Sequence, residues 1–173
     1  MGKRKARAFT QAQKDAADWD RARTETRPAV SDVVAPGIGL RRMQLVVCPS
    51  FCEASAWEVR QLQGDWSLFR SQVVTPWPNL MLRGYERLSI DSATLSEFFA
   101  RIIKLSLPIS PDLSGTGGAD GTIWQLAAFG DIFSEWRFQW WSRPPARWKR
   151  LGEIAMEMAQ VFSSAEPVRS TES

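Results

Sequence analysis

Histidine is absent from this chain of 173 residues, which contains only two cysteines and one tyrosine. Without imidazole, nucleophilic catalysis of the Ser-His-Asp or Cys-His type is excluded. Cys48 and Cys52 are separated by three residues, which is not the Cys-x-x-Cys spacing of redox motifs, and a zinc site of four thiolates would need two more cysteines. We therefore expect two reduced thiols, no metal and no cofactor, with a disulfide or an intermolecular metal site as the alternative for the cysteines.

Long apolar runs are also missing. No segment reaches the roughly 18 consecutive apolar residues that a membrane-spanning helix needs. Basic residues occur near the N-terminus, but the apolar core of a secretory signal peptide does not follow them. We therefore expect no membrane span and a cytoplasmic location.

The positive charge of the chain is confined to its N-terminal part. Residues 1–42 hold ten lysines and arginines against five acidic residues, whereas residues 43–173 hold twelve against fourteen. Binding to a nucleic-acid backbone normally needs a clustered Lys/Arg face, and the second part has an acidic excess instead. We therefore expect the folded domain not to bind nucleic acid.

Tryptophan is the abundant residue, with nine copies in a chain whose hydrophobic fraction of 44% and charged fraction of 24% are ordinary. Each indole offers a large apolar area and one N–H group that needs a partner when it is buried. The tryptophans therefore indicate either an aromatic-rich core or a contact surface, and in a small domain the core is the favoured interpretation.

The chain divides into three parts by composition. Residues 1–42 are polar and basic and end in a stretch interrupted by proline and glycine, so we expect a disordered tail and linker. Residues 43–163 are expected to form a single folded domain that opens with the apolar run MQLVV, and residues 164–173 a disordered tail. Met43 is an alternative start of translation.

In the first half of the domain, residues 54–74 alternate in polarity around Gly64 and Asp65, which predicts a β-hairpin. Residues 81–88 are a plausible third short strand. Asp91 is a good N-cap for an amphipathic helix that ends before Pro108, because apolar residues recur after it with helical spacing. These residues are Leu95, Phe98, Phe99, Ile102 and Ile103.

In the second half, residues 122–129 and 133–141 are predicted to form another hairpin. The pair Pro144-Pro145 suits the first turn of a helix that carries one apolar stripe. The stripe consists of Trp148, Leu151, Ile154, Ala155, Met158, Val161 and Phe162. The order ββ(β)αββα predicts an α+β fold, with an antiparallel sheet of about five strands and two helices packed on one face.

The glycine-rich loop at residues 115–121 lacks the Gly-Lys-Ser/Thr of a Walker loop and leads into a strand rather than a helix. A hairpin entry is the favoured interpretation, and an anion-binding loop is the alternative. Asp112 and Asp120 flank this loop. Glu53, Glu58 and Glu86 lie near the first sheet, so a paired acid/base site among these carboxylates is an alternative. Asp112 and Asp120 also occupy ordinary turn positions.

Trp140 and Trp141 are adjacent, so in a regular strand their side chains point to opposite faces of the sheet. One of them should lie outside the main core. Trp141 near Arg137, Arg143 and Arg147 has the composition of a protein-binding hot spot. The alternative is that Trp141 packs under the Pro144-Pro145 corner.

Residues 119–158 resemble a recurring pattern in small uncharacterised bacterial proteins. The matching residues are Asp120, Gly121, Thr122, Trp140, Trp141, Pro144, Pro145, Trp148 and Leu151. The resemblance implies a bacterial α+β domain and transfers no catalytic residue. Small immunity-type proteins are similar in size and layout only.

Two classes of function fit these patterns. The first is a non-catalytic protein-binding module, immunity-like in size, that uses Trp141, Arg137, Arg143 and Arg147. The second is a small enzyme or ligand-binding domain that uses the loop from Asp112 to Gly121. The sequence favours the first class and does not predict an oligomeric state.

Overall fold

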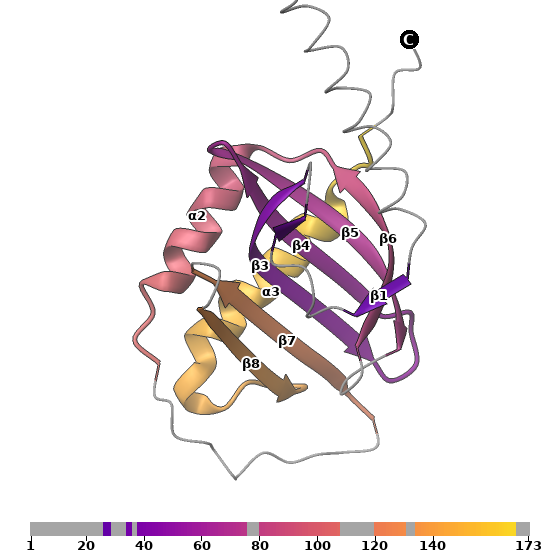
Figure 1. Ribbon diagram of the computed structural model, residues 1–173. Helices are drawn as coiled ribbons and strands as arrows, with labels where there is room; N and C mark the ends of the chain where they lie inside the picture. The colour runs from indigo at the N-terminus through magenta and orange to yellow at the C-terminus, as the bar shows by residue number, and fades with distance from the viewer. Residues whose placement is uncertain are drawn as a thin grey trace, which may run out of the picture.

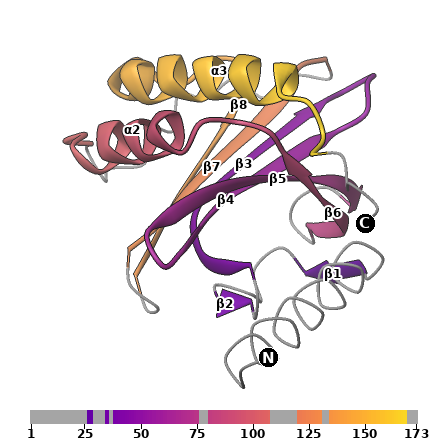
Figure 2. The same ribbon diagram turned by 90° about the horizontal axis from the view of Figure 1, so that it is seen from above.

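The computed structural model describes residues 26–28, 34–35, 38–75, 80–107, 120–130 and 134–168. These residues form one antiparallel sheet with two helices on one of its faces, which confirms the α+β class (Figures 1 and 2). The helices are α2 (Ser92–Ile103) and α3 (Lys149–Ser164), and a 3-10 turn, η1 (Ala146–Trp148), precedes α3. The six long strands are β3 (Gly39–Pro49), β4 (Ser55–Leu62), β5 (Asp65–Thr75), β6 (Met81–Leu88), β7 (Thr122–Phe129) and β8 (Glu135–Trp141), and the two short strands are β1 (Thr26–Pro28) and β2 (Val34–Ala35).

The sheet order is β1-β6-β5-β4-β3-β7-β8, and β2 pairs separately with β3. Strands β3 to β6 are consecutive antiparallel neighbours, so this part of the sheet is a meander. The chain then passes through α2 and returns to the other side of β3, where β7 and β8 complete the sheet. β3 therefore lies in the middle of the long strands.

The sheet has six long strands rather than about five, and the strand that was not expected is the central strand β3. The apolar run that opens at Met43 belongs to β3, which begins earlier, at Gly39. Residues 43–46 are all buried, because a central strand of this sheet is covered on both faces. Its side chains therefore lack the alternation that marks a half-exposed strand.

The sheet also extends beyond the expected domain boundaries of 43 and 163. β1 pairs with β6, β2 pairs with β3, and Ile38 packs against Phe69 and Tyr85. Beyond the C-terminal boundary of the expected domain, Pro167 forms an isolated antiparallel β-bridge with Leu88. Parts of both segments expected to be disordered thus belong to the fold, whereas residues 1–25 and 169–173 lie outside the described residues.

The predicted hairpin at residues 54–74 is confirmed as β4 and β5. Its two turn residues are Gln63 and Gly64, since Leu62 pairs with Asp65. Both have positive φ, 52° and 95°, which is typical of the type I′ turns that connect twisted strands.

α2 has the N-cap that the sequence predicted, and α3 has the predicted apolar stripe. The Asp91 carboxylate accepts a hydrogen bond from the Thr94 N–H at 3.2 Å, which caps α2. Gly152 lies in the first turn of α3, where a Cβ would be 2.3 Å from Pro144 Cγ. The glycine lets the helix pack closely on the proline corner. The residues that α3 buries include Leu151, Ile154, Ala155, Met158 and Phe162.

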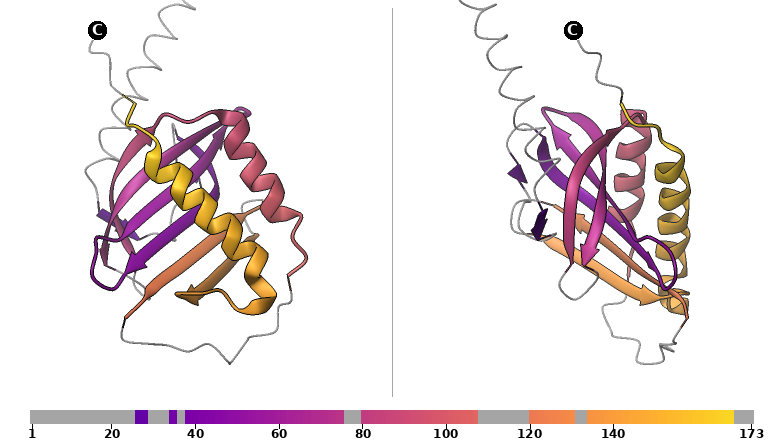
Figure 3. Two further views of the ribbon diagram at one scale, coloured as in Figure 1. Left: turned by 180° about the vertical axis from the view of Figure 1, so that it is seen from behind. Right: turned by 90° about the vertical axis from the view of Figure 1, so that its right-hand side faces the viewer.

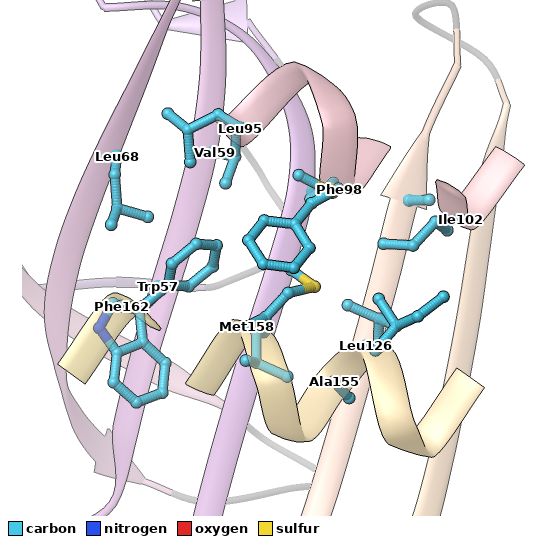
Figure 4. Close-up of a cluster of buried hydrophobic side chains, with 14 of the residues drawn as sticks. Trp57, Val59, Leu68, Leu95, Phe98, Ile102, Leu126, Ala155, Met158 and Phe162 are labelled. Atoms are coloured by element: carbon cyan, nitrogen blue, oxygen red, sulfur yellow. The ribbon is translucent and has the colours of Figure 1, made fainter. Parts of the chain in front are cut away.

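The main core lies between the helices and one face of the sheet. Figure 4 shows side chains of β4, β5 and β7 meeting those of α2 and α3. Phe162 of α3 contacts Trp57 of β4, with ring centroids 6.3 Å apart, and Phe98 of α2 at 5.8 Å. The helices are also joined at the surface, where Arg101 pairs with Glu157. Figure 3 shows both helices on the same face of the sheet.

The predicted hairpin of the second half is confirmed as β7 and β8. The Trp140 indole stacks on Trp124 with ring centroids 6.2 Å apart, and Phe138 contacts Trp148 edge-on at 5.2 Å. Trp136 points to the same face, but 47% of it is exposed. The aromatic row of β8 is therefore covered by η1 and α3 at its C-terminal end and open at its N-terminal end.

Candidate functional site

A cleft of about 790 Å³ opens at one end of β4, β5 and β6. Its floor consists of two rows of paired residues: Ser55, Gln72 and Arg83 in one, Arg70 and Glu86 in the other. Trp57 packs against α3, so its side chain lies on the helix-bearing face of the sheet. Arg70 is the register partner of Trp57 and points to the same face, because paired residues share a face of the sheet. These rows thus lie on the helix-bearing face, at the end of the strands that the two helices leave uncovered.

An ion pair forms part of the cleft floor. One carboxylate oxygen of Glu86 accepts hydrogen bonds from Arg70 Nε at 3.0 Å and from Arg70 Nη2 at 2.5 Å. The side chains are 40% and 43% exposed, so the pair contributes little to stability. Its effect is to fix one charge of each sign across the two strands.

Two further charges at the cleft have no ion-pair partner among the residues that the structure describes. Arg83 on β6 and Glu53 before β4 are both exposed, and neither forms an ion pair with another residue that the structure describes. Pro167 and Val168 line the same cleft from the C-terminal segment. Arg87 is also among the lining residues, but its guanidinium donates to the Ser67 hydroxyl at 3.2 Å. Among the described residues, Arg83 and Glu53 are therefore the cation and the anion that the cleft has available.

A β-bulge in β6 sets the direction of these charges. Gly84 and Tyr85 together lie opposite Ser71, because the register shifts between Arg70 and Gln72. Gly84 has φ +68°, a conformation that favours glycine and is typical of such bulges. The extra residue brings both Arg83 and Glu86 to the helix-bearing face. Ser71 is among the residues around the cleft, but it pairs with Ala56, so its side chain points to the opposite face of the sheet.

The opposite face of the sheet carries a buried charged cluster around Glu58. The Glu58 carboxylate accepts hydrogen bonds from Tyr85 Oη at 2.7 Å, Arg60 Nη2 at 2.8 Å and Gln44 Nε2 at 3.3 Å. It also pairs with Arg41 Nη2 at 3.1 Å. Both guanidinium groups and the carboxylate have no exposed side-chain surface. This burial separates the cluster from solvent, so we assign it to the core rather than to a binding site.

The structure places Trp141 and Arg137 on the face of β8 away from the helices. Trp141 is half-buried, and its Nε1 lies 2.5 Å from where a Cβ on Gly121 would be. The expected opposite orientation of Trp140 and Trp141 is confirmed, with Trp140 in the core. Arg137 pairs with Glu135 on the same strand.

Among the described residues, the side chains of the other residues of the expected site make no contact with the Trp141 indole that would join them into one site. Arg143 and Arg147 are exposed in the corner between β8 and α3. The Arg143 backbone N–H donates to the Trp141 carbonyl at 2.6 Å, but no ring contact, side-chain hydrogen bond or ion pair joins Arg143 or Arg147 to the Trp141 indole in this part of the chain. Asp120 is exposed, and Asp112 lies outside the described residues together with most of the glycine-rich loop.

The two cysteines are free thiols. Burial raises the pKa of the Cys48 thiol above its ordinary value, and Cys52 is exposed. Within the described ranges, no group of three or more Cys, Asp or Glu side chains is placed to hold a metal ion. None of the described helices is long and apolar enough to cross a membrane.

Comparisons of the chain with protein-family models, with curated proteins and with solved structures find no match.

The cleft residues come from separate parts of the sequence. Arg83 and Glu53 are thirty positions apart, and neither belongs to a motif. The available signal is Gly84, since a glycine inside a strand pattern indicates a bulge or a close approach of another group.

Proposed function

We propose that this protein is a non-catalytic binding module that holds a protein partner in the cleft over β4, β5 and β6. The observation that carries the proposal is the pair of available charges, Arg83 and Glu53, beside the fixed Arg70–Glu86 ion pair. A partner with a carboxylate opposite Arg83 and a cation opposite Glu53 would complete the cleft. Complementary charges of this kind set the register and the specificity of an interface.

The character of the cleft supports a protein partner rather than a small molecule. Small-molecule sites are mostly apolar, with a few polar groups that fix the orientation of the ligand. This cleft is open, and its lining contains three arginines and two glutamates. Such a lining resembles the polar and arginine-rich parts of protein–protein interfaces.

The chemistry at the cleft supports a role without catalysis. A nucleophilic serine needs a base within hydrogen-bond reach. Ser55 lies in the cleft floor, and among the described residues its hydroxyl does not bond to a carboxylate. One oxygen of the Glu86 carboxylate already accepts hydrogen bonds from Arg70 Nε and Nη2.

Quantitative affinity capture from a lysate of the native host tests the proposal. We expect the wild-type chain to retain a partner that the variants Arg83→Glu and Glu53→Arg lose, because each variant reverses one available charge. Arg150→Glu is the matched control, since Arg150 is exposed in the first turn of α3, away from the cleft. All variants should keep the wild-type circular dichroism spectrum.

Retention of the partner by both folded cleft variants would contradict this assignment. Loss of the partner in Trp141→Ala, with retention in the cleft variants, would instead favour the surface that contains Trp141, Arg137, Arg143 and Arg147.

A further inference from the structure

The two edges of the sheet differ in whether their backbone groups are paired by another segment. At the β6 edge, β1 pairs with residues 81–83, and the C-terminal segment covers the other end. There, Ser89 N–H donates to the Glu166 carbonyl at 2.7 Å, and Val168 N–H donates to the Arg87 carbonyl at 2.9 Å. At the opposite edge, β8 pairs with β7 alone among the described strands (Figure 1).

The direction of the free backbone groups of β8 follows from the hydrogen bonds at its two ends. Ser142 N–H donates to the Thr122 carbonyl at 2.7 Å, and Gly130 N–H donates to the Ser134 carbonyl at 3.0 Å. The register between these ends has no shift. Because hydrogen-bonded pairs alternate along an antiparallel ladder, the even-numbered residues of β8 bond to β7. Glu135, Arg137 and Gln139 therefore direct their N–H and C=O groups outward.

The usual protections of an edge strand are weak here. Edge strands commonly avoid pairing with other chains through proline, lysine, a bulge or a very short length. β8 has seven residues, EWRFQWW, with no proline, glycine or lysine. Its two charges are a glutamate and an arginine that already pair with each other.

The side chains leave only the N-terminal half of β8 open. At the C-terminal half, Phe138 lies against Trp148 and Trp140 is buried. At the N-terminal half, Trp136 is 47% exposed on the helix-bearing face. Glu135 and Arg137 lie beside it on the other face. An incoming strand therefore has room to pair around Trp136.

We propose that this edge binds a second copy of the chain, with the two β8 strands antiparallel about a two-fold axis at Trp136. This register places Glu135 opposite the partner subunit's Arg137, and Arg137 opposite the partner subunit's Glu135. Both pairs occupy hydrogen-bonded positions, so the outward backbone groups of these residues are satisfied. Trp136 meets its copy at a non-hydrogen-bonded position, where side chains approach most closely.

Charge complementarity selects the second copy and this register. A two-fold axis at Arg137 would place like charges directly opposite each other, which is destabilising. An axis at Phe138 would use the half of β8 that lies against η1 and would leave both charges without an opposite charge. The proposal concerns a different surface from the cleft and does not depend on the function proposed above.

Sedimentation velocity over a dilution series tests this proposal. We expect the wild-type chain to shift from monomer to dimer as its concentration rises. Arg137→Glu and Glu135→Arg each convert two attractive contacts into two repulsive ones, so each should weaken the dimer about tenfold or more. Arg143→Glu makes the same charge change outside the strand and should leave the dimer unchanged.

Mixing the two single variants provides the decisive step. An equimolar mixture of Arg137→Glu and Glu135→Arg chains places opposite charges across the edge again and should restore a dimer, as should the double variant. A wild-type chain that remains monomeric at every concentration reached would overturn the proposal. A wild-type dimer that the single variants do not weaken, or that the mixture does not restore, would also overturn it.

Discussion

Replacing Glu58 by glutamine removes the only carboxylate that the described structure places in the buried cluster on the sheet face away from the helices. In the folded protein, this carboxylate accepts from Tyr85 at 2.7 Å and pairs with Arg60 at 2.8 Å and with Arg41 at 3.1 Å. Removing one partner of a buried ion pair leaves the remaining charge without its compensation and costs about 3–5 kcal/mol. Since small domains are stable by about 5–15 kcal/mol, the variant should lose a large part of its stability.

Chemical denaturation followed by tryptophan fluorescence measures this loss. The matched control is Glu157→Gln, which removes a carboxylate that accepts from Arg101 at 2.9 and 2.6 Å at the surface. Exposed pairs contribute about 0–1 kcal/mol, so the control should stay near wild type. Equal losses for the two variants would refute the assignment of Glu58 to the buried core.

Three further predictions concern packing, backbone and thiol chemistry. Leu151→Ala should lower the free energy of unfolding by about 2–5 kcal/mol in a denaturant titration, because Leu151 is fully buried; a loss below about 1 kcal/mol would contradict its place in the core. Gly39→Ala should lower the thermal midpoint more than Gly64→Ala, since both glycines have positive φ but only at Gly39 would a Cβ clash, 2.4 Å from the Gln61 carbonyl oxygen; equal midpoints would contradict this. With a thiol reagent at mildly alkaline pH, Cys52 should react before Cys48, whose pKa is raised by burial; a fast phase that persists in Cys52→Ser would contradict that order.

Local signals in the sequence predicted much of the helix-bearing half of the fold. The cap at Asp91, the hairpin at residues 54–74 and the apolar stripe after Trp148 depend on neighbouring residues, and all three are confirmed. These patterns are reliable because the periods of helices and strands repeat over short distances.

The opposite face of the sheet could not be predicted in the same way. Glu58 and Arg60 alternate with Trp57 and Val59, which is typical of a strand with one solvated face. In the structure both charges are buried with Arg41 and Tyr85. The reason is tertiary, since the pairing of four side chains from three strands makes burial of these charges possible.

The candidate site depends on similar long-range placement. The reasoning about Trp140 and Trp141 gave the correct opposite orientations, but Trp141 lies against Gly121, the residue before β7, rather than standing free. Arg83 and Glu53 meet at one cleft only because three strands pair in register around the bulge at Gly84. No local sequence pattern marked Arg83 or Glu53 as part of a cleft.

Site-specific photocross-linking tests the central claim most directly. A photoreactive phenylalanine analogue is placed at Ser55 and at Gln72, which lie in the same cleft row as Arg83, and at Arg150 as the control on α3. After irradiation in the native host, the proposed function predicts that both cleft positions form a cross-link to the same protein and that the control position forms none. Cross-links that form from Trp141 or Arg143 but not from the cleft positions would contradict it.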